Sequence, residues 1–239
     1  MQYPEPCARK KSNRLFAALP DADWIRWMAH LELVELSFEQ VLFEHGRPLS
    51  HVYFPITGIV SLQCNLEDGT SSEFALVGNE GLVGVFIFMG TSSSISNAVV
   101  IREGLAYRFS ADLLIDEFNH FGTVRRLILL YMQAMMTEAS QRVVCHRRHL
   151  IDQQLCRIIL LCLDRTQDNQ LRLTQELIAR TMGVRREAIA VAAKQLQTAG
   201  LISYMRGCIR VLDRVGIELL ACECYEIVKI EFDRLLLHK

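Results

Sequence analysis

The stretch 173–196 constrains the fold of this chain more than any other, because its pattern is that of two short helices joined by a tight turn. Thr174 is a favourable N-cap, and an apolar helix face begins at Leu177. Ala179 is small where a second helix must cross closely, and Gly183 can adopt the left-handed conformation that ends a helix. These residues predict a first helix that ends at a glycine turn.

The residues after the turn predict a second helix that packs across the first. Its expected inward-facing residues are Ile189, Ala192, Ala193 and Leu196. Two short helices joined in this way form a helix-turn-helix, whose second helix can enter the major groove of DNA. The outer face of that helix offers arginines, which can bond guanine in bidentate fashion, and a glutamate, which can accept a hydrogen bond from cytosine.

A β-hairpin is predicted after the second helix. Residues 201–204, a turn at Arg206-Gly207 and residues 208–212 have the pattern of a two-stranded wing, and Asp213 is expected to cap a closing helix over 214–237. The predicted DNA-binding residues of the two helices and the wing are Thr174, Gln175, Arg185, Arg186, Glu187, Ala190, Val191, Lys194 and Arg206.

Charge is unevenly distributed along the chain, although the net charge is only −1. Residues 1–120 carry 8 basic and 15 acidic side chains, whereas residues 171–215 carry 8 basic and 3 acidic ones. An acidic half beside a basic half indicates that a polyanion binds at the C-terminal end. Together with the helix-turn-helix pattern, this balance predicts double-stranded DNA as the partner.

The N-terminal half has the pattern of a β domain. From about Val34 to Ser110, short apolar runs such as 52–54 and 59–62 alternate with turn signals. Strands at spacings of about 8–12 residues predict a sandwich or barrel-like domain. Asp68-Gly69 is a candidate hairpin turn, and a short helix is expected over residues 22–31.

A long helix is predicted over residues 123–145, which contain neither Gly nor Pro. The candidate residues of a dimer interface, at heptad a/d spacing, are Ile128, Met132, Met135 and Ala139. A helix this apolar must be buried on more than one side. We expect one face to pack on the β domain and another on a partner chain. The alternative is that the whole helix is buried within one subunit. A polar break over 147–152, which is a candidate hinge, and a helix over 151–163 are expected to follow.

We therefore expect an α+β chain with three parts: a β domain (1–120), a long helix and hinge (121–147), and a winged helix-turn-helix (148–239). No stretch reaches the roughly 20 apolar residues of a membrane span, and the N-terminus lacks the apolar core of a signal peptide. We expect a cytoplasmic protein that does not act on membranes. No catalytic spacing or phosphate-cradling glycine loop occurs, so catalytic residues are not expected.

With these features, the chain resembles the Crp/Fnr family of bacterial transcription regulators. The resemblance covers nearly the whole length and is carried by residues 51–62, 77–84, 173–194 and 199–202. It implies an N-terminal β-roll of the cyclic-nucleotide-binding-like jelly-roll type, a long dimerisation helix and a C-terminal winged helix. It also implies a homodimer on a near-palindromic DNA site, contact with RNA polymerase, and a β domain that can hold an unidentified small-molecule effector.

The sequence departs from the cyclic-AMP-binding members of this family. Their β-roll holds a Gly-Glu pair for the ribose and an arginine for the cyclic phosphate. Here Val85 follows Gly84, no arginine occurs between Val85 and Ile101, and residues 94–98 stand where the arginine is expected. Because the cyclic phosphate needs a cation or convergent donors, the sequence predicts that cyclic AMP is not bound in the family mode.

The recognition helix matches the family in part. Members often carry Arg-Glu and another arginine one turn later. Arg186 and Glu187 match this pair, whereas Val191 stands at the place of the later arginine. The valine loses a donor and gains an apolar surface for a thymine methyl, so we expect a target that differs from the best-known family sites.

The cysteines do not predict a cofactor. An iron–sulfur cluster of the oxygen-sensing type is not expected, because Cys7 and Cys64 are the only cysteines before residue 145. Cys145 and His149 share a helix face, but no third or fourth metal ligand stands at a recognisable spacing, so no metal is predicted. Cys222 and Cys224 fall on different faces of the expected closing helix, where a redox role is an open alternative to burial.

A second function class remains open from the sequence. Val191 and the sparse outer face of the recognition helix also fit a small-molecule or redox sensor that acts through protein partners, with a winged helix that no longer reads DNA. Duplex binding that depends strongly on salt would favour the regulator, because contacts to phosphates release counterions.

Overall fold

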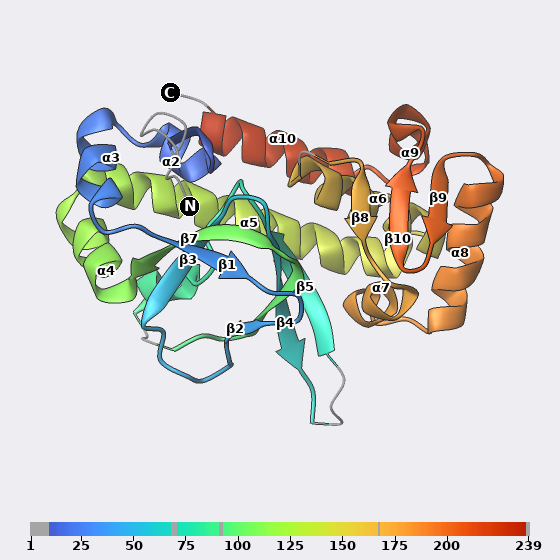
Figure 1. Cartoon of the computed structure of the whole chain (residues 1–239), viewed down its shortest axis with the longest axis horizontal. Coiled ribbons are helices and arrows are strands. Elements are labelled where there is room, and N and C mark those ends of the chain that lie inside the picture. The colour runs from blue at the N-terminus through green and yellow to red at the C-terminus, as the bar shows by residue number, and fades with distance from the viewer. Residues whose placement is uncertain (1–9, 68–70, 91–92, 167, 238–239) are drawn as a thin grey trace.

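The computed structural model describes residues 10–67, 71–90, 93–166 and 168–237. An N-terminal β-roll lies at one end, a C-terminal domain of helices with a small sheet lies at the other, and one long helix runs along both (Figure 1). The expected α+β class, with a β domain, a long helix and a winged helix-turn-helix, is confirmed.

Two antiparallel sheets form the β-roll, one in the order β1-β7-β3 and the other in the order β2-β6-β4-β5. The strands are β1 (Glu32–Leu36), β2 (Val41–Phe43), β3 (His51–Pro55), β4 (Ile59–Asn65), β5 (Ser71–Val77), β6 (Asn97–Arg102) and β7 (Gly104–Ser110). β4 and β5 pair as antiparallel neighbours, with Cys64 opposite Ser72, so the predicted pairing of these two strands is confirmed. The proposed turn at Asp68-Gly69 lies outside the described residues.

Short helices close the ends of the β-roll. They are α2 (Arg14–Ala18), α3 (Asp21–Met28), the 3-10 helix η1 (Val85–Met89) and α4 (Ala111–His120). α3 corresponds to the helix expected over 22–31, whereas α2 and α4 were not predicted. Phe16 of α2 packs between Trp24 and Phe54, with ring centroids 5.2 and 4.6 Å away. This aromatic contact anchors the N-terminal helices on β3.

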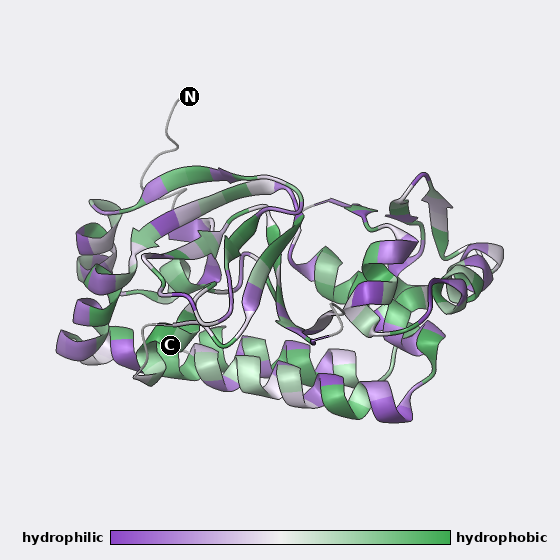
Figure 2. Ribbon diagram, turned by 90° about the horizontal axis from the view of Figure 1, so that it is seen from below, coloured by the Kyte–Doolittle hydropathy of each residue, from purple (hydrophilic) through white to green (hydrophobic). Residues whose placement is uncertain are grey.

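The long helix α5 (Gly122–Arg148) covers one side of the β-roll (Figures 1 and 2). Tyr131 packs so closely on Gly81 that a side chain there would overlap its hydroxyl. The same hydroxyl donates to the Leu82 carbonyl oxygen at 3.1 Å. Glu138 accepts a hydrogen bond from the Leu76 N–H at 3.1 Å. These contacts place α5 against the end of β5 and the segment that follows it.

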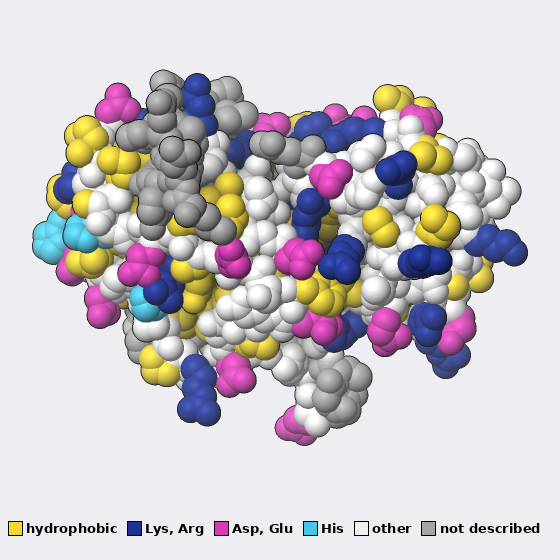
Figure 3. Space-filling model, in the orientation of Figure 1, with side chains coloured by type: hydrophobic (Ala, Val, Ile, Leu, Met, Phe, Trp, Pro, Cys, Tyr) yellow, Lys and Arg dark blue, Asp and Glu magenta, His cyan; other side chains and the backbone are white. Residues whose placement is uncertain are grey.

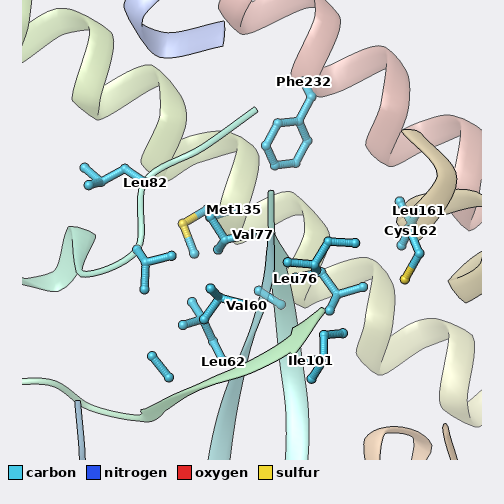
Figure 4. Close-up of a cluster of buried hydrophobic side chains, with 14 of the residues drawn as sticks. Val60, Leu62, Leu76, Val77, Leu82, Ile101, Met135, Leu161, Cys162 and Phe232 are labelled. Carbon is cyan, nitrogen blue, oxygen red and sulfur yellow. The ribbon is translucent and has the colours of Figure 1, made fainter. Parts of the chain in front are cut away.

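Apolar side chains of β4 and β5 meet α5 in the core (Figure 4). Val60, Leu62 and Leu76 are 2% exposed or less, and Met135 of α5 points into the same cluster. Hydrophobic and hydrophilic residues are interspersed along α5 in Figure 2, as a helix with a core on one side and solvent on another requires.

The dimer residues predicted on α5 must be corrected in part. Ile128 is 2% exposed and Met135 is 7% exposed, because both pack into the core of their own chain. Met132 and Ala139 keep part of their surface accessible. Two of the four predicted positions therefore face the core of their own chain. The exposed apolar residues Leu129 and Met136 each lie one residue further along the helix.

The C-terminal domain packs four helices around a small antiparallel sheet of order β8-β10-β9. Its elements are α6 (Ile151–Asp164), β8 (Gln170–Arg172), α7 (Gln175–Met182), α8 (Arg186–Thr198), β9 (Ile202–Met205), β10 (Cys208–Val211) and α9 (Arg214–Leu220). The helix expected over 151–163 and both strands of the wing are confirmed. The third strand, β8, was not predicted.

The single closing helix expected over 214–237 is wrong. α9 ends at Leu220, Ala221 is extended, and a separate helix α10 (Cys224–Leu237) begins after it. α10 turns back along α5 and reaches α2 (Figure 1). Gln133 donates to Glu231 at 3.1 Å, and Arg14 lies 2.7 Å from Asp233. The C-terminal helix therefore packs on the long helix and the β-roll.

Among the described residues, no helix is both long enough and apolar enough to cross a membrane.

Candidate DNA-binding surface

The first helix of the motif, α7, has both ends fixed by its own sequence. The Thr174 hydroxyl accepts a hydrogen bond from the Leu177 N–H at 3.0 Å, as predicted for an N-cap. At the other end Gly183 has φ +63°, and the Gly183 and Val184 N–H groups donate to the carbonyl oxygens of Arg180 and Ala179. This pattern is a Schellman motif, which ends α7 and turns the chain sharply into α8.

The second helix, α8, presents a polar face because its apolar face is fully used. Ile189, Ala192, Ala193 and Leu196 are all 3% exposed or less, as predicted. The opposite face is therefore held toward solvent. No side chain caps the start of α8, so the first N–H groups of the helix remain available to an anion such as a DNA phosphate.

The wing is a tight hairpin that presents an arginine at its tip. Met205 lies opposite Cys208, so Arg206 and Gly207 alone form the turn. Both have positive φ, 51° and 76°, which is the conformation of a type I′ turn. A side chain at position 207 would come within 3.0 Å of Thr174, so the wing tip lies against the start of α7.

The predicted DNA-binding residues all lie at the surface, and most of them are exposed. Thr174, Arg185, Arg186, Glu187, Val191, Lys194 and Arg206 are exposed, while Gln175 and Ala190 are half-buried. A shallow groove runs between the start of α7, the start of α8 and the wing. It is lined by Thr174, Gln175, Glu176, Arg186, Tyr204, Arg206 and Gly207. The structure thus brings residues from all three predicted segments together.

Tyr204 is a residue of this groove that sequence reasoning missed. Its hydroxyl donates to the Leu173 carbonyl oxygen at 2.9 Å, and its N–H donates to Gln197. Burial raises the pKa of Tyr204, so the phenol stays protonated and donates. The alternation along β9 was the available signal, because it places Tyr204 and Ile202 on the same side of the hairpin.

The basic side chains divide into two groups by their partners. Arg172 pairs with Glu103 at 3.1 Å, and Arg180 lies 3.9 Å from Glu39, so both face the acidic β-roll. A second group makes no ion pair with any described residue. It includes the four basic members of the predicted DNA-binding set, which are Arg185, Arg186, Lys194 and Arg206. Lys and Arg side chains are visible at the right-hand end of Figure 3, over the C-terminal domain.

The segment that would hold a cyclic phosphate is apolar or internally bonded. Val85, Phe86 and Ile87 of η1 are 7% exposed or less. Ser94 donates to the Ser96 carbonyl oxygen at 2.7 Å, and both serines are buried. No lysine or arginine occurs over residues 85–101. The described part of this segment therefore offers no cation to an anionic ligand.

Two family models match separate parts of the chain. Residues 33–120 match the cyclic nucleotide-binding domain, and residues 153–220 match the Crp-like helix-turn-helix domain. A search of curated protein sequences found no match.

Solved structures of bacterial regulators share this fold. FixK2 from Bradyrhizobium japonicum has a TM-score of 0.68 at 18% identity, covering 80% of this chain and 98% of that one. A Crp/Fnr-family transcriptional regulator from Thermus thermophilus has a TM-score of 0.61 at 21% identity, covering 80% and 98%. The c-di-GMP-responsive global regulator CLP of Xanthomonas campestris has a TM-score of 0.59 at 20% identity, covering 80% and 99%.

The β-roll coincides with the match to the cyclic nucleotide-binding domain, the winged helix-turn-helix coincides with the match to the Crp-like helix-turn-helix domain, and the long helix α5 lies between the two matches. Relatives with this fold are described as transcriptional regulators of the Crp/Fnr family. The chain belongs to the Crp/Fnr family of transcription regulators.

Proposed function

We propose that this chain is a homodimer that binds a near-palindromic site in double-stranded DNA, with α8 in the major groove. The observation that carries the proposal is the group of four cations around α8 and the wing, none of which pairs with a described acidic residue. An unpaired group on one surface is the pattern that phosphate binding requires.

Each residue of the surface has a role in this proposal that follows from its place. Arg186 and Glu187, in the first turn of α8, face base edges as a guanine donor and a cytosine acceptor. Val191, which is 59% exposed, offers an apolar contact to a thymine methyl beside Ala190. The remaining predicted residues position the protein on phosphates, and they are Thr174, Gln175, Arg185, Lys194 and Arg206.

The second copy of the chain is proposed to pack on the exposed row of α5. Leu129, Met136 and Val143 are 49, 65 and 63% exposed and stand seven residues apart. Met132 and Ala139 follow the first two at the spacing of heptad d positions. This spacing is that of the seam of a two-stranded coiled coil. Without a partner helix, the exposed apolar side chains of this row would remain in contact with water. A DNA-binding dimer of this kind would act in the cytoplasm.

Cyclic AMP is not the proposed effector. The support is the apolar η1 and the absence of a lysine or arginine over residues 85–101. A calorimetric titration of the full chain with cyclic AMP is expected to give no binding heat at micromolar concentrations. Saturable binding in that range would contradict this part of the proposal and would require donors other than an arginine of that segment.

The proposed function is tested by selection from a random pool of DNA duplexes. The expected result is a two-fold symmetric motif with half-sites about one helical turn apart, bound with a strong salt dependence. An enriched motif without symmetry would contradict the dimer on a palindrome. No enrichment, with weak and salt-independent binding, would contradict DNA reading and favour a sensor that acts through protein partners.

A further inference from the structure

Three cysteines and a histidine from two distant parts of the chain meet at the end of α5. Cys145 lies in the last turn of α5, and His149 follows that helix directly. Cys222 lies between α9 and α10, and Cys224 is the first residue of α10. Their sulfur and ring nitrogen atoms all lie within 4.8 Å of one another. The Cys145 and Cys222 sulfurs are 3.5 Å apart, and the Cys224 sulfur is 3.6 Å from His149 Nδ1.

We propose that Cys145, His149, Cys222 and Cys224 bind one Zn²⁺ ion in a tetrahedral Cys₃His site. A zinc–sulfur bond of about 2.3 Å and a zinc–nitrogen bond of about 2.0 Å imply ligand atoms roughly 3.5–3.8 Å apart in a tetrahedron. The Cys145–Cys222 and Cys224–His149 separations match these edges. Four protein ligands close the coordination sphere, which is typical of a structural zinc site and not of a catalytic one.

The break between α9 and α10 makes this site possible. In one continuous helix, Cys222 and Cys224 would point to different faces. Because Ala221 is extended and α10 starts at Cys224, both cysteines are instead turned toward Cys145, and all three are 4% exposed or less. The ligands missing near Cys145 in the sequence are therefore supplied from 77 residues away. Cys222 and Cys224 follow the end of the helix-turn-helix match at residue 220.

The histidine is oriented as a metal ligand would be. His149 Nδ1 faces the cysteine sulfurs, while Nε2 lies 3.3 Å from a carboxylate oxygen of Glu223. Histidines that bind metals commonly donate their other ring N–H to a carboxylate, which fixes the ring and its tautomer. Glu223 is the residue between the two cysteines, so one short segment supplies both ligands and the group that orients the third.

A buried cation beside the site lacks a partner of its own. Arg157 of α6 is fully buried, and no nitrogen of its guanidinium has a hydrogen-bond partner among the described residues. Its charge acts on the sulfurs of Cys145, Cys222 and Cys224. Zn²⁺ with three thiolates carries a net negative charge. Bound zinc would therefore add opposite charge beside a buried cation that makes no hydrogen bond to a described residue.

The arrangement favours a single ion over an iron–sulfur cluster. Ligand atoms that are all within 4.8 Å of one another surround one atom, whereas the thiolates of a cluster are spread around several irons. The ion would join the hinge end of α5 to the start of α10. It would thus fix how the winged helix meets the long helix, which is a role beyond DNA contact itself.

Metal analysis of the purified full chain tests the proposal. Prepared in reducing buffer without chelator, it is expected to carry one zinc per chain. The Cys222→Ser variant is expected to lose it, while Cys64→Ser, at an exposed cysteine of β4, keeps it. Cobalt added to the stripped protein is expected to give the visible absorption of a tetrahedral thiolate site. Iron in place of zinc, a Cys145–Cys222 disulfide in reducing buffer, or zinc equally retained by Cys222→Ser would overturn the proposal.

A milder variant keeps the test decisive if Cys222→Ser does not fold. Glu223→Gln retains all four ligands and changes only the group beside His149 Nε2. Loss of such a partner is expected to weaken zinc binding by about 10–100-fold in a chelator competition. Glu226→Gln, at an exposed residue in the first turn of α10, is the matched control and should bind zinc like the parent. Equal affinity of all three proteins would contradict the proposed coordination by His149.

Discussion

Arg165 Nη2 donates a hydrogen bond to Glu138 Oε2 at 2.9 Å, and this pair joins the end of α6 to the middle of α5. Arg165 Nε also donates to Glu80 in the segment after β5, at 2.8 Å. All three side chains are 6% exposed or less. Gly78 allows the approach, because a side chain there would come within 2.6 Å of Arg165. One buried cation thus holds together the β-roll, the long helix and the DNA-binding domain.

Arg165→Met is expected to destabilise the fold strongly, because it leaves Glu138 and Glu80 buried without their cation. The expected loss in free energy of unfolding is about 3–5 kcal/mol, measured by urea denaturation. Arg234→Met is the control, since its pair with Glu231 lies at the surface, is screened by solvent and should contribute little to stability. Similar losses for the two variants would contradict the importance of the buried pair.

The local features of this chain were predictable from the sequence. The cap at Thr174, the left-handed Gly183 and the two-residue turn at Arg206-Gly207 depend on residues within one or two turns of the chain. Periodicity gave the inward face of α8 for the same reason, because every buried position there lies on a single helix face.

The features that were missed depend on contacts between distant residues. The face of α5 that is buried is decided by the β-roll and by α10, so periodicity alone placed Met135 on the wrong surface. The end of α9 at Leu220 carries no glycine or proline signal. The proximity of Cys145 and Cys222 appears only after α10 has folded back along α5, which no local spacing encodes.

Arg186→Ala is expected to weaken binding to the selected duplex by about 1–3 kcal/mol and to relax the preference at one base position. Arg186 stands in the first exposed turn of α8, where a bidentate contact to guanine is in reach. Arg206→Ala, at the wing tip, is the comparison. Its loss should be uniform across sequences and should lower the salt slope by about 1. If Arg186→Ala binds with unchanged affinity and base preference, the proposed contact between Arg186 and a base is wrong.

Met136→Glu is expected to convert the proposed dimer to a monomer. Met136 is 65% exposed at the centre of the row formed with Leu129 and Val143. Burying one such side chain contributes about 1.5–3 kcal/mol. A two-fold symmetric dimer buries the Met136 side chain of both copies. The dissociation constant of the dimer should therefore rise at least about 100-fold. Sedimentation equilibrium measures the change. Leu219→Glu, at an 82% exposed position of α9, should leave the dimer intact; a parent protein that is already monomeric would contradict the proposed seam.

The contact between α3 and α4 is expected to lose its stabilising effect in acid. Arg26 donates to both carboxylate oxygens of Glu117, at 3.0 and 2.7 Å, and Trp27 Nε1 donates to the same group at 2.9 Å. The hydrogen bonds from Arg26 are the main cause that lowers the pKa of Glu117, despite the opposing effect of burial. The folded chain therefore holds this carboxylate ionised at a pH where the unfolded chain already binds a proton.

The sign of the effect follows from that lowered pKa. The stabilisation by Glu117 is fully present above its unfolded pKa of about 4.3 and is lost as the pH falls through the lower pKa of the folded state. At pH 7 the Glu117→Gln variant should be less stable than the parent by about 1 kcal/mol, since Arg26 is 37% exposed. The gap between the two urea unfolding curves should close as the pH is lowered to about 3. A gap that stays constant over this range would mean that Glu117 stabilises the fold without its charge.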